Sequence, residues 1–212
     1  MIKLYDFLPC PFGQKVRIVL AEKGLSYELI EVDITKGENR RPDFLRLNPY
    51  GKVPVLIDEE TTVYDSTIIN EYLEDEYPEP PVLPAIGNSA LRARARLFED
   101  FADTSFTPQI GQLMVEMAKP EAERDAERLG RLHQGVGRVL DYLNHELQGQ
   151  QFLASDFSIA DIGFAPRLLV LQALGIEAGQ NRANVEAWIN RLLERPSIAN
   201  VKGLTTDPIA GI

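Results

Sequence analysis

The hydrophobic pattern of this chain changes once, at a proline-rich segment that begins at Pro78. Before it, short apolar stretches alternate with helical ones, and after it helical periodicity continues with few breaks. The segment PEPPVLPAIGN holds four of the fourteen prolines and has no helical period, so it predicts an ordered linker. We therefore expect an α/β domain at residues 1–78, a linker at 79–88 and an all-helical domain at 89–212.

The first domain is predicted to have the element order β-α-β-α-β-β-α. Its expected strands are Ile2–Phe7, Tyr27–Val32, Val53–Asp58 and Thr61–Tyr64, and its expected helices are Gln14–Lys23, Pro42–Leu47 and Ser66–Tyr77. Two β-α units, a hairpin and a closing helix can form one mixed four-stranded sheet with helices packed on its faces. This is the thioredoxin-like order.

The second domain is predicted to consist of four helical segments. They are Ser89–Met117, bent near Pro108, then Glu121–Leu147, Ser158–Leu174 and Val185–Glu194. Within the second segment the apolar residues form one stripe at helical spacing. The third segment starts at Ser158-Ile159-Ala160-Asp161, the pattern of a capping box, in which the serine and the acid each bond the other's amide. For Asp161 we therefore expect a folding role.

Charge and composition exclude several classes of protein. A net charge of -10 argues against binding to nucleic acid, which needs clustered Lys and Arg. No apolar run approaches the roughly 18 residues of a membrane span, and the N-terminus lacks a signal-peptide pattern, so a cytoplasmic protein is expected. One cysteine rules out an intramolecular disulfide, and the two histidines do not have metal-site spacing, so no metal is expected.

Cys10 is the first candidate for chemistry, because it lies between the first expected strand and the first helix. Pro11 fits the first helical turn, where its missing amide hydrogen costs nothing. A thiol at a helix N-terminus faces free amides and the positive end of the helix dipole, which stabilise the thiolate. A thiolate attacks disulfides and electrophilic carbons. The alternative is a small buried hydrophobic residue, the role of most lone cysteines.

Gly51-Lys52-Val53-Pro54-Val55 is the second candidate. A proline just ahead of a strand in this order is a natural place for a cis peptide bond. That isomer would leave the Val53 backbone free to pair with a peptide-like ligand. A trans proline at the start of a strand is the alternative.

Asp65 and Ser66 open the helix that ends near Tyr77, and they are the third candidate. Either residue can be an ordinary N-cap. Alternatively, this N-terminus receives an anion, with the Ser66 hydroxyl and the free amides holding a carboxylate.

Together these segments make the chain resemble the glutathione transferase superfamily along nearly its whole length. The matching strings are CPFGQKVRIVLAEKG, FLRLNPYGKVPVLID, YDSTIINEYLEDEYP and FSIADIGFAP. The resemblance implies that glutathione is the co-substrate, that Val53 pairs with its cysteinyl backbone and that Pro54 is cis. It also implies that Ser66 and Asp65 hold the γ-glutamyl end and that Lys52 approaches the glycyl carboxylate. The helical domain would supply the pocket for a small electrophilic or disulfide substrate, and a homodimer is implied.

The chain departs from the family pattern at two positions. Asp65 stands where the family usually has the longer Glu, which puts its reach to the γ-glutamyl amine in doubt. Cys10 stands where many classes have a catalytic Ser or Tyr, and CPFG resembles the cysteine-bearing omega, lambda and dehydroascorbate-reductase classes, whose cysteine forms a mixed disulfide with glutathione. The resemblance therefore implies glutathione-dependent thiol transfer or reduction through Cys10. Conjugation of glutathione to electrophiles is the close alternative, and Tyr5 is interpreted as a packing residue.

A second resemblance points to a protein that is not an enzyme. QKVRIVLAEKG and EYLEDEYPEPPVLP are similar to strings of the stringent starvation proteins, which share the fold and bind RNA polymerase. Cys10 and the GKVP segment resemble an intact glutathione site, which favours the enzyme.

Overall fold

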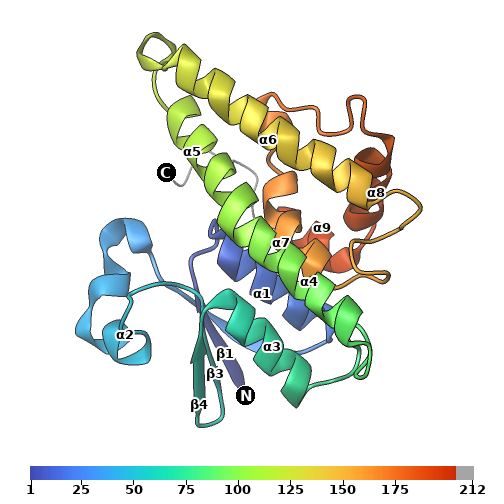
Figure 1. Ribbon diagram of the computed structural model, residues 1–212. Helices are drawn as coiled ribbons and strands as arrows, with labels where there is room; N and C mark the ends of the chain where they lie inside the picture. The colour runs from blue at the N-terminus through green and yellow to red at the C-terminus, as the bar shows by residue number, and fades with distance from the viewer. Residues whose placement is uncertain (204–212) are drawn as a thin grey trace.

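The computed structural model describes the course of the chain over residues 1–203 and its side chains over residues 1–199. The predicted helical domain, 89–212, ends beyond the described residues. Figure 1 shows the sheet and its three helices as one part of the molecule, with the later helices packed together beside it. No described helix is both long and apolar enough to cross a lipid bilayer.

The sheet is mixed and four-stranded, as predicted, with the strand order β2-β1-β3-β4. Its strands are β1 (Ile2–Asp6), β2 (Tyr27–Glu31), β3 (Val55–Asp58) and β4 (Thr61–Tyr64). β1 runs parallel to β2 and antiparallel to β3, which is antiparallel to β4. β3 begins two residues later than predicted, because its ladder starts where Val55 faces Tyr5 on one side and Tyr64 on the other.

Helices cover both faces of the sheet. They are α1 (Pro11–Glu22), α2 (Pro42–Leu47) and α3 (Ser66–Glu76), with 3-10 turns at Ile34–Lys36 and Glu38–Arg40. Alternate strand residues point to opposite faces, so Leu4 and Leu56 join the main core while Tyr5 and Val55 pack with Phe44 of α2. The rings of Tyr5 and Phe44 meet edge to face at 6.4 Å. This contact agrees with a packing role for Tyr5.

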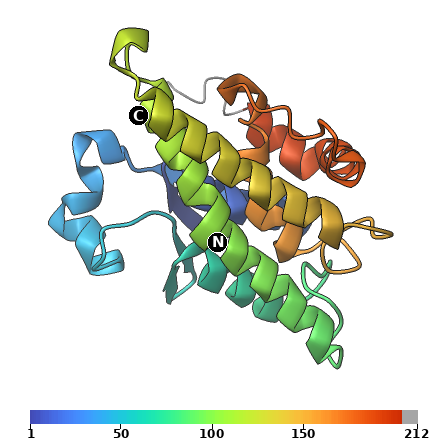
Figure 2. The ribbon, with the colours of Figure 1, turned by 45° about the horizontal axis from the view of Figure 1, so that its top comes forward.

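The second part is helical, and α7 lies at its centre (Figure 2). Its helices are α4 (Ser89–Phe101), α5 (Thr107–Met117), α6 (Ala126–Glu146), α7 (Ile159–Leu168), α8 (Ala183–Leu193) and α9 (Pro196–Gly203), with 3-10 turns at Glu121–Glu123 and Gln172–Leu174. α7 packs on α1, α4, α5, α8 and α9. The predicted capping box of α7 is confirmed, and the fully buried Asp161 also accepts from the Leu153 amide and Trp188 Nε1.

Two features of the helical part differ from the prediction. A π-helical segment, Ala102–Phe106, divides the predicted long helix into α4 and α5. The division lies next to Pro108, which has no amide to donate to the carbonyl of Thr104 four residues earlier. The sequence also did not predict α9, which packs on α1, where Arg195 pairs with Glu22 at 2.6 Å.

The linker is held at its start by buried charges. Lys23, at the end of α1, pairs with Glu74 of α3 at 2.8 Å and donates to the carbonyls of Tyr77 and Pro80. The Glu74 carboxylate in turn accepts from the amides of Val82 and Leu83. Because the backbone groups of the linker are bonded by side chains, it is ordered, as its proline content predicts.

Candidate functional site

A cleft of about 380 Å³ lies between the start of β3, the start of α3 and the π-helical segment of the second part. Its walls are formed by Phe12, Asn48, Tyr50, Lys52, Val53, Pro54, Tyr64, Asp65, Ser66 and Asp103. Five of the six residues predicted for a site therefore share one cavity, namely Lys52, Val53, Pro54, Asp65 and Ser66. Cys10 is not among the lining residues, although Phe12, two residues further along, is.

The Val53–Pro54 peptide bond is cis, as the sequence predicts. The Val53 side chain packs against the small core under α2. No described residue forms a hydrogen bond with the Val53 amide or carbonyl, whereas the neighbouring Lys52 carbonyl accepts from the Asn48 side chain at 2.7 Å. The cleft wall thus offers one residue, Val53, with a free backbone donor and a free backbone acceptor, which is what strand-like pairing with a peptide ligand needs.

Of Asp65 and Ser66, the structure assigns the capping role to Asp65. Asp65 is the N-cap of α3, and its Oδ1 accepts from the amides of Thr67 at 3.0 Å and Ile68 at 3.4 Å. Its backbone has φ 75°, a conformation that non-glycine residues rarely adopt and that is often found at ligand sites. Ser66 is the first residue of the helix and is 3% exposed. Capping thus occupies one oxygen of the Asp65 carboxylate. The cleft wall also contains a second carboxylate, that of Asp103.

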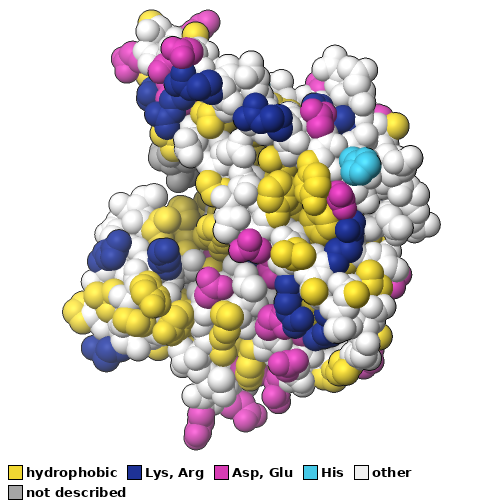
Figure 3. Space-filling view, viewed as in Figure 1, with side chains coloured by type: hydrophobic (Ala, Val, Ile, Leu, Met, Phe, Trp, Pro, Cys, Tyr) yellow, Lys and Arg dark blue, Asp and Glu magenta, His cyan; other side chains and the backbone are white. Residues whose placement is uncertain are grey.

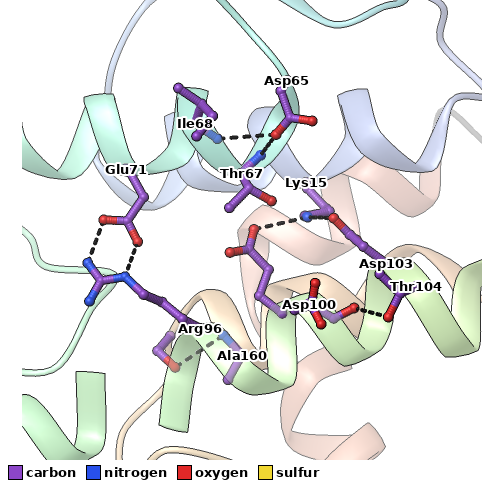
Figure 4. Close-up of polar contacts among 12 residues, drawn as sticks. Lys15, Asp65, Thr67, Ile68, Glu71, Arg96, Asp100, Asp103, Thr104 and Ala160 are labelled. Carbon is purple, nitrogen blue, oxygen red and sulfur yellow. Dashed lines mark hydrogen bonds and ion pairs between the residues drawn. The ribbon is translucent and has the colours of Figure 1, made fainter. Parts of the chain in front are cut away.

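Asp103 is a lining residue that the sequence did not reveal, because it comes from the second part of the chain. It lies in the π-helical segment, and its Oδ2 pairs with Lys15 of α1 at 2.7 Å. Lys15 also pairs with Glu99 of α4 at 2.9 Å, and both of these side chains are 1% exposed. Burial raises the pKa values of Glu99 and Asp103, and the Lys15 charge opposes this rise. Figure 4 shows Lys15 and Asp103 meeting beside Asp65 and Thr67 of α3.

Cys10 occupies the position that the sequence predicts, immediately before α1. It is the N-cap residue and Pro11 is the first helical residue, as expected. The thiol is partly buried, and it makes no capping hydrogen bond with the helix. The backbone amides of Phe12 and Gly13 still lie near enough to lower its pKa, as the position at a helix N-terminus predicts.

The predicted consequence, a lowered pKa of the Cys10 thiol, is wrong. Burial, followed by the negative charge of Asp6, raises the pKa of Cys10 to about 11, and the amides and Arg167 offset only part of this rise. Burial also raises the pKa of Asp6 to about 7, although Arg17 lies 3.1 Å away. The helix N-terminus fails to produce a thiolate because the stabilisation of a charge at a helix end is smaller than the cost of removing that charge from water.

The arrangement suits a peptide-like ligand that carries charges of both signs. The cleft combines the Lys52 ammonium, the free backbone amide and carbonyl of Val53, the Ser66 hydroxyl and the carboxylates of Asp65 and Asp103. Carboxylates pair with an amine, while ammonium and hydroxyl groups hold a carboxylate. In the part of the chain that the structure describes, no three His, Cys, Asp or Glu side chains form a group that could hold a metal ion.

Comparison with known proteins gives the same family for both parts of the chain. The family description "Glutathione S-transferase, N-terminal domain" matches residues 4–81, and "Glutathione S-transferase, C-terminal domain" matches residues 106–196. Among curated proteins, a stringent starvation protein A homolog of Pasteurella multocida is 33% identical over 195 residues, which are 92% of this chain and 86% of that one. Glutathione S-transferase 3 of Zea mays is 32% identical over 208 residues, which cover 92% and 90%.

Among solved structures, the glutathione transferase URE2P8 of Phanerochaete chrysosporium, determined with oxidised glutathione, superposes with a TM-score of 0.85. It is 27% identical, and the alignment covers 94% of this chain and 92% of that one.

Proposed function

Because the chain belongs to the glutathione S-transferase family, we propose that it is a transferase that binds glutathione in the cleft beside α3. One observation carries this proposal: Lys52, Val53, Pro54, Asp65 and Ser66, each predicted from the sequence to contact glutathione, line one cavity. Val53 would pair with the cysteinyl backbone and Lys52 would approach the glycyl carboxylate. Ser66 and Asp65 would hold the γ-glutamyl end, with Asp103 as a further acid there.

Glutathione binding is tested by calorimetric titration of a Ser66→Ala variant. Loss of one hydroxyl that bonds a charged ligand group should weaken binding about tenfold or more. Ser89→Ala is a matched control, because Ser89 is the exposed first residue of α4 and follows the side-chain cap Asn88 as Ser66 follows Asp65. Equal affinity in the parent and Ser66→Ala would contradict the placement of glutathione, and no binding to the parent would contradict the proposed function.

For the reaction, the protonated state of Cys10 favours conjugation. The glutathione sulfur would form a bond to an electrophilic carbon, the bond from that carbon to its leaving group would break, and the thiol proton would pass to solvent. A neutral Cys10 thiol beside this sulfur can donate a weak hydrogen bond to it. Cys10→Ser, which keeps a donor at the same position, should preserve or increase the conjugation rate.

Thiol transfer is the second candidate, and the amides of Phe12 and Gly13 at the Cys10 sulfur favour it. The Cys10 thiolate would attack a mixed disulfide, bond to one sulfur and release the other as a thiolate. A glutathione thiolate would then attack the Cys10 adduct and release Cys10, since the chain contains no second cysteine. Under this mechanism Cys10→Ser and Cys10→Ala lose all disulfide exchange, whereas under conjugation both variants keep activity with electrophiles.

Alkylation of Cys10 across pH, with and without glutathione, separates these two reactions. In the free chain, a pKa of about 11 predicts a rate that rises tenfold with each pH unit between 7 and 10. A shift of this profile to lower pH when glutathione is bound would support thiol transfer. An unchanged profile would support conjugation.

A protein that binds RNA polymerase without catalysis is the remaining candidate, and the similarity to the stringent starvation protein A homolog supports it. It predicts no retention on immobilised glutathione and recovery of RNA polymerase subunits with the tagged chain. Retention on glutathione together with no recovery of polymerase would contradict it.

We also propose that the protein is a cytoplasmic homodimer. Figure 3 shows hydrophobic side chains gathered between α4 and α6, where Leu97 is 69% exposed and Tyr142 is 45% exposed. Exposed apolar patches of this kind mark contact surfaces. Sedimentation of the Leu97→Asp variant tests the proposal, because a charge at this position should give a monomer, and an unchanged molecular mass would contradict this use of the surface.

A further inference from the structure

A partly buried positive charge near Cys10 is left without a carboxylate partner. The fully buried basic side chains Lys15, Arg17 and Lys23 each have a carboxylate within 3.1 Å. Arg167, on α7, is partly buried, and no described residue places a carboxylate within ion-pair distance of it. Its Nε atom is buried without a hydrogen-bond partner.

The surroundings of Arg167 place it at the junction of three helices. α7 packs against α5 and against α1, the helix that begins after Cys10. Arg167 Nη1 donates to the Sδ atom of Met114 on α5 at 3.0 Å, and a thioether is a weak acceptor. The guanidinium also lies near enough to Cys10 for its charge to lower the pKa of the thiol.

A guanidinium whose Nε atom is buried without a partner is stabilised when an anion completes its hydrogen bonds. Arg167 does not line the cleft beside α3, and the carboxylates of glutathione are already assigned there to Lys52 and Ser66. An anion at Arg167 would lie against α5 and α7, in the helical part of the chain, which the proposed function assigns to the second substrate. A guanidinium binds a carboxylate in a planar fork of two hydrogen bonds.

We propose that Arg167 is the anion-binding residue of the second-substrate site, and that this substrate carries a carboxylate close to its reacting atom. The inference rests on the proposed transferase function and narrows the substrate class to anionic electrophiles or anionic disulfides. Met114 would give this substrate an apolar contact beside Arg167, and Cys10 would mark the position of the reacting sulfur. A neutral substrate would leave the guanidinium unpaired.

The test compares two alkylating reagents that differ only in charge, iodoacetate and iodoacetamide. Each reagent forms a bond from the Cys10 sulfur to its methylene carbon and releases iodide, and Cys10 is the single cysteine of the chain. The ratio of the two rates is independent of the thiol pKa, because the same thiolate attacks both reagents. In Arg167→Gln this ratio, iodoacetate over iodoacetamide, should fall about 10- to 100-fold.

Two further variants serve as controls. Arg167→Lys keeps the charge and should retain most of the ratio, while Arg131→Gln removes an exposed arginine of α6 that pairs with Glu127 and should leave the ratio unchanged. Equal slowing of both reagents in Arg167→Gln would show that Arg167 acts on Cys10 alone, which would overturn the proposal. Failure of both reagents to alkylate Cys10 in the folded parent would also overturn it, because no anion could then reach this place.

Measurements of turnover separate this inference from the transferase function. In the conjugation of glutathione, the kcat/KM for 4-chloro-3-nitrobenzoate should fall at least tenfold in Arg167→Gln, and the kcat/KM for the matched benzamide should not change. If the parent conjugates neither compound but shows the iodoacetate preference, the anion site stands and the conjugation reaction fails. If the parent conjugates both and Arg167→Gln changes neither, the transferase stands and the anion site fails.

Discussion

Two positive charges beside the candidate site, Lys15 and Arg167, differ in their partners. Lys15 joins α1 to the second part of the chain and has two carboxylates, from Glu99 and Asp103, within 3 Å. Arg167, on α7, lies near Cys10, and its side-chain hydrogen-bond partner is the thioether sulfur of Met114. A buried charge with complete partners belongs to the folded structure itself. Arg167 is partly buried and has no carboxylate partner, so its guanidinium is available to an anionic ligand.

The largest effect should follow from Lys15→Met. This change leaves the carboxylate of Glu99 buried without a compensating charge, which should lower the free energy of unfolding by about 3–5 kcal/mol. Urea denaturation measures the loss. The double variant Lys15→Met/Glu99→Gln should recover a large part of it, because the orphaned charge is then removed. Equal stability of the parent and the single variant would show that the network does not hold the two parts together.

An intermediate effect is expected from Asp6→Asn, which removes a negative charge near Cys10. The Asp6 carboxylate raises the thiol pKa, so its removal should lower that pKa and speed alkylation by iodoacetamide at pH 8, up to about tenfold. Because the pKa of Asp6 is about 7, this carboxylate is protonated at pH 5.5 and the two proteins should then react at similar rates.

The control for this change is Asp43→Asn, which alters an exposed acid on α2 and should have no effect on the alkylation rate. Asp6→Asn also leaves Arg17 buried without its carboxylate, so its folding is checked by circular dichroism before the rates are compared. A rate difference that persisted unchanged at pH 5.5 would contradict a charge effect of Asp6.

The smallest effect should come from Arg167→Met. No carboxylate is orphaned by this change, and the methionine replaces the apolar stem of the arginine, so the free energy of unfolding should change by less than about 1 kcal/mol. The same urea experiment measures it. A loss comparable to that of Lys15→Met would remove the distinction between the two charges and show that Arg167 has an internal partner.

The sequence predicts most of the cleft because local signals specify it. The proline before a strand led to the cis bond at Pro54, and the Asp-Ser pair before an apolar period led to the start of α3. Asp103 was missed because it reaches the cleft through tertiary packing. The only related sequence signal was the predicted bend near Pro108, close to the π-helical segment that contains Asp103. The pKa of Cys10 was predicted in the wrong direction, since burial and the charge of Asp6 depend on contacts that spacing does not reveal.

The charge network around Lys15 also limits how this chain can be recombined. Its lysine precedes the linker in sequence, and its two acids follow the linker. A chimera joined within the proline-rich linker would therefore combine Lys15 of one protein with the helical part of another, which need not contain the two acids. The composition of the linker alone would suggest it as the place to join two proteins. A successful exchange of domains must transfer Lys15, Glu99 and Asp103 together. Because Asp103 also lines the cleft, such an exchange changes the cleft as well.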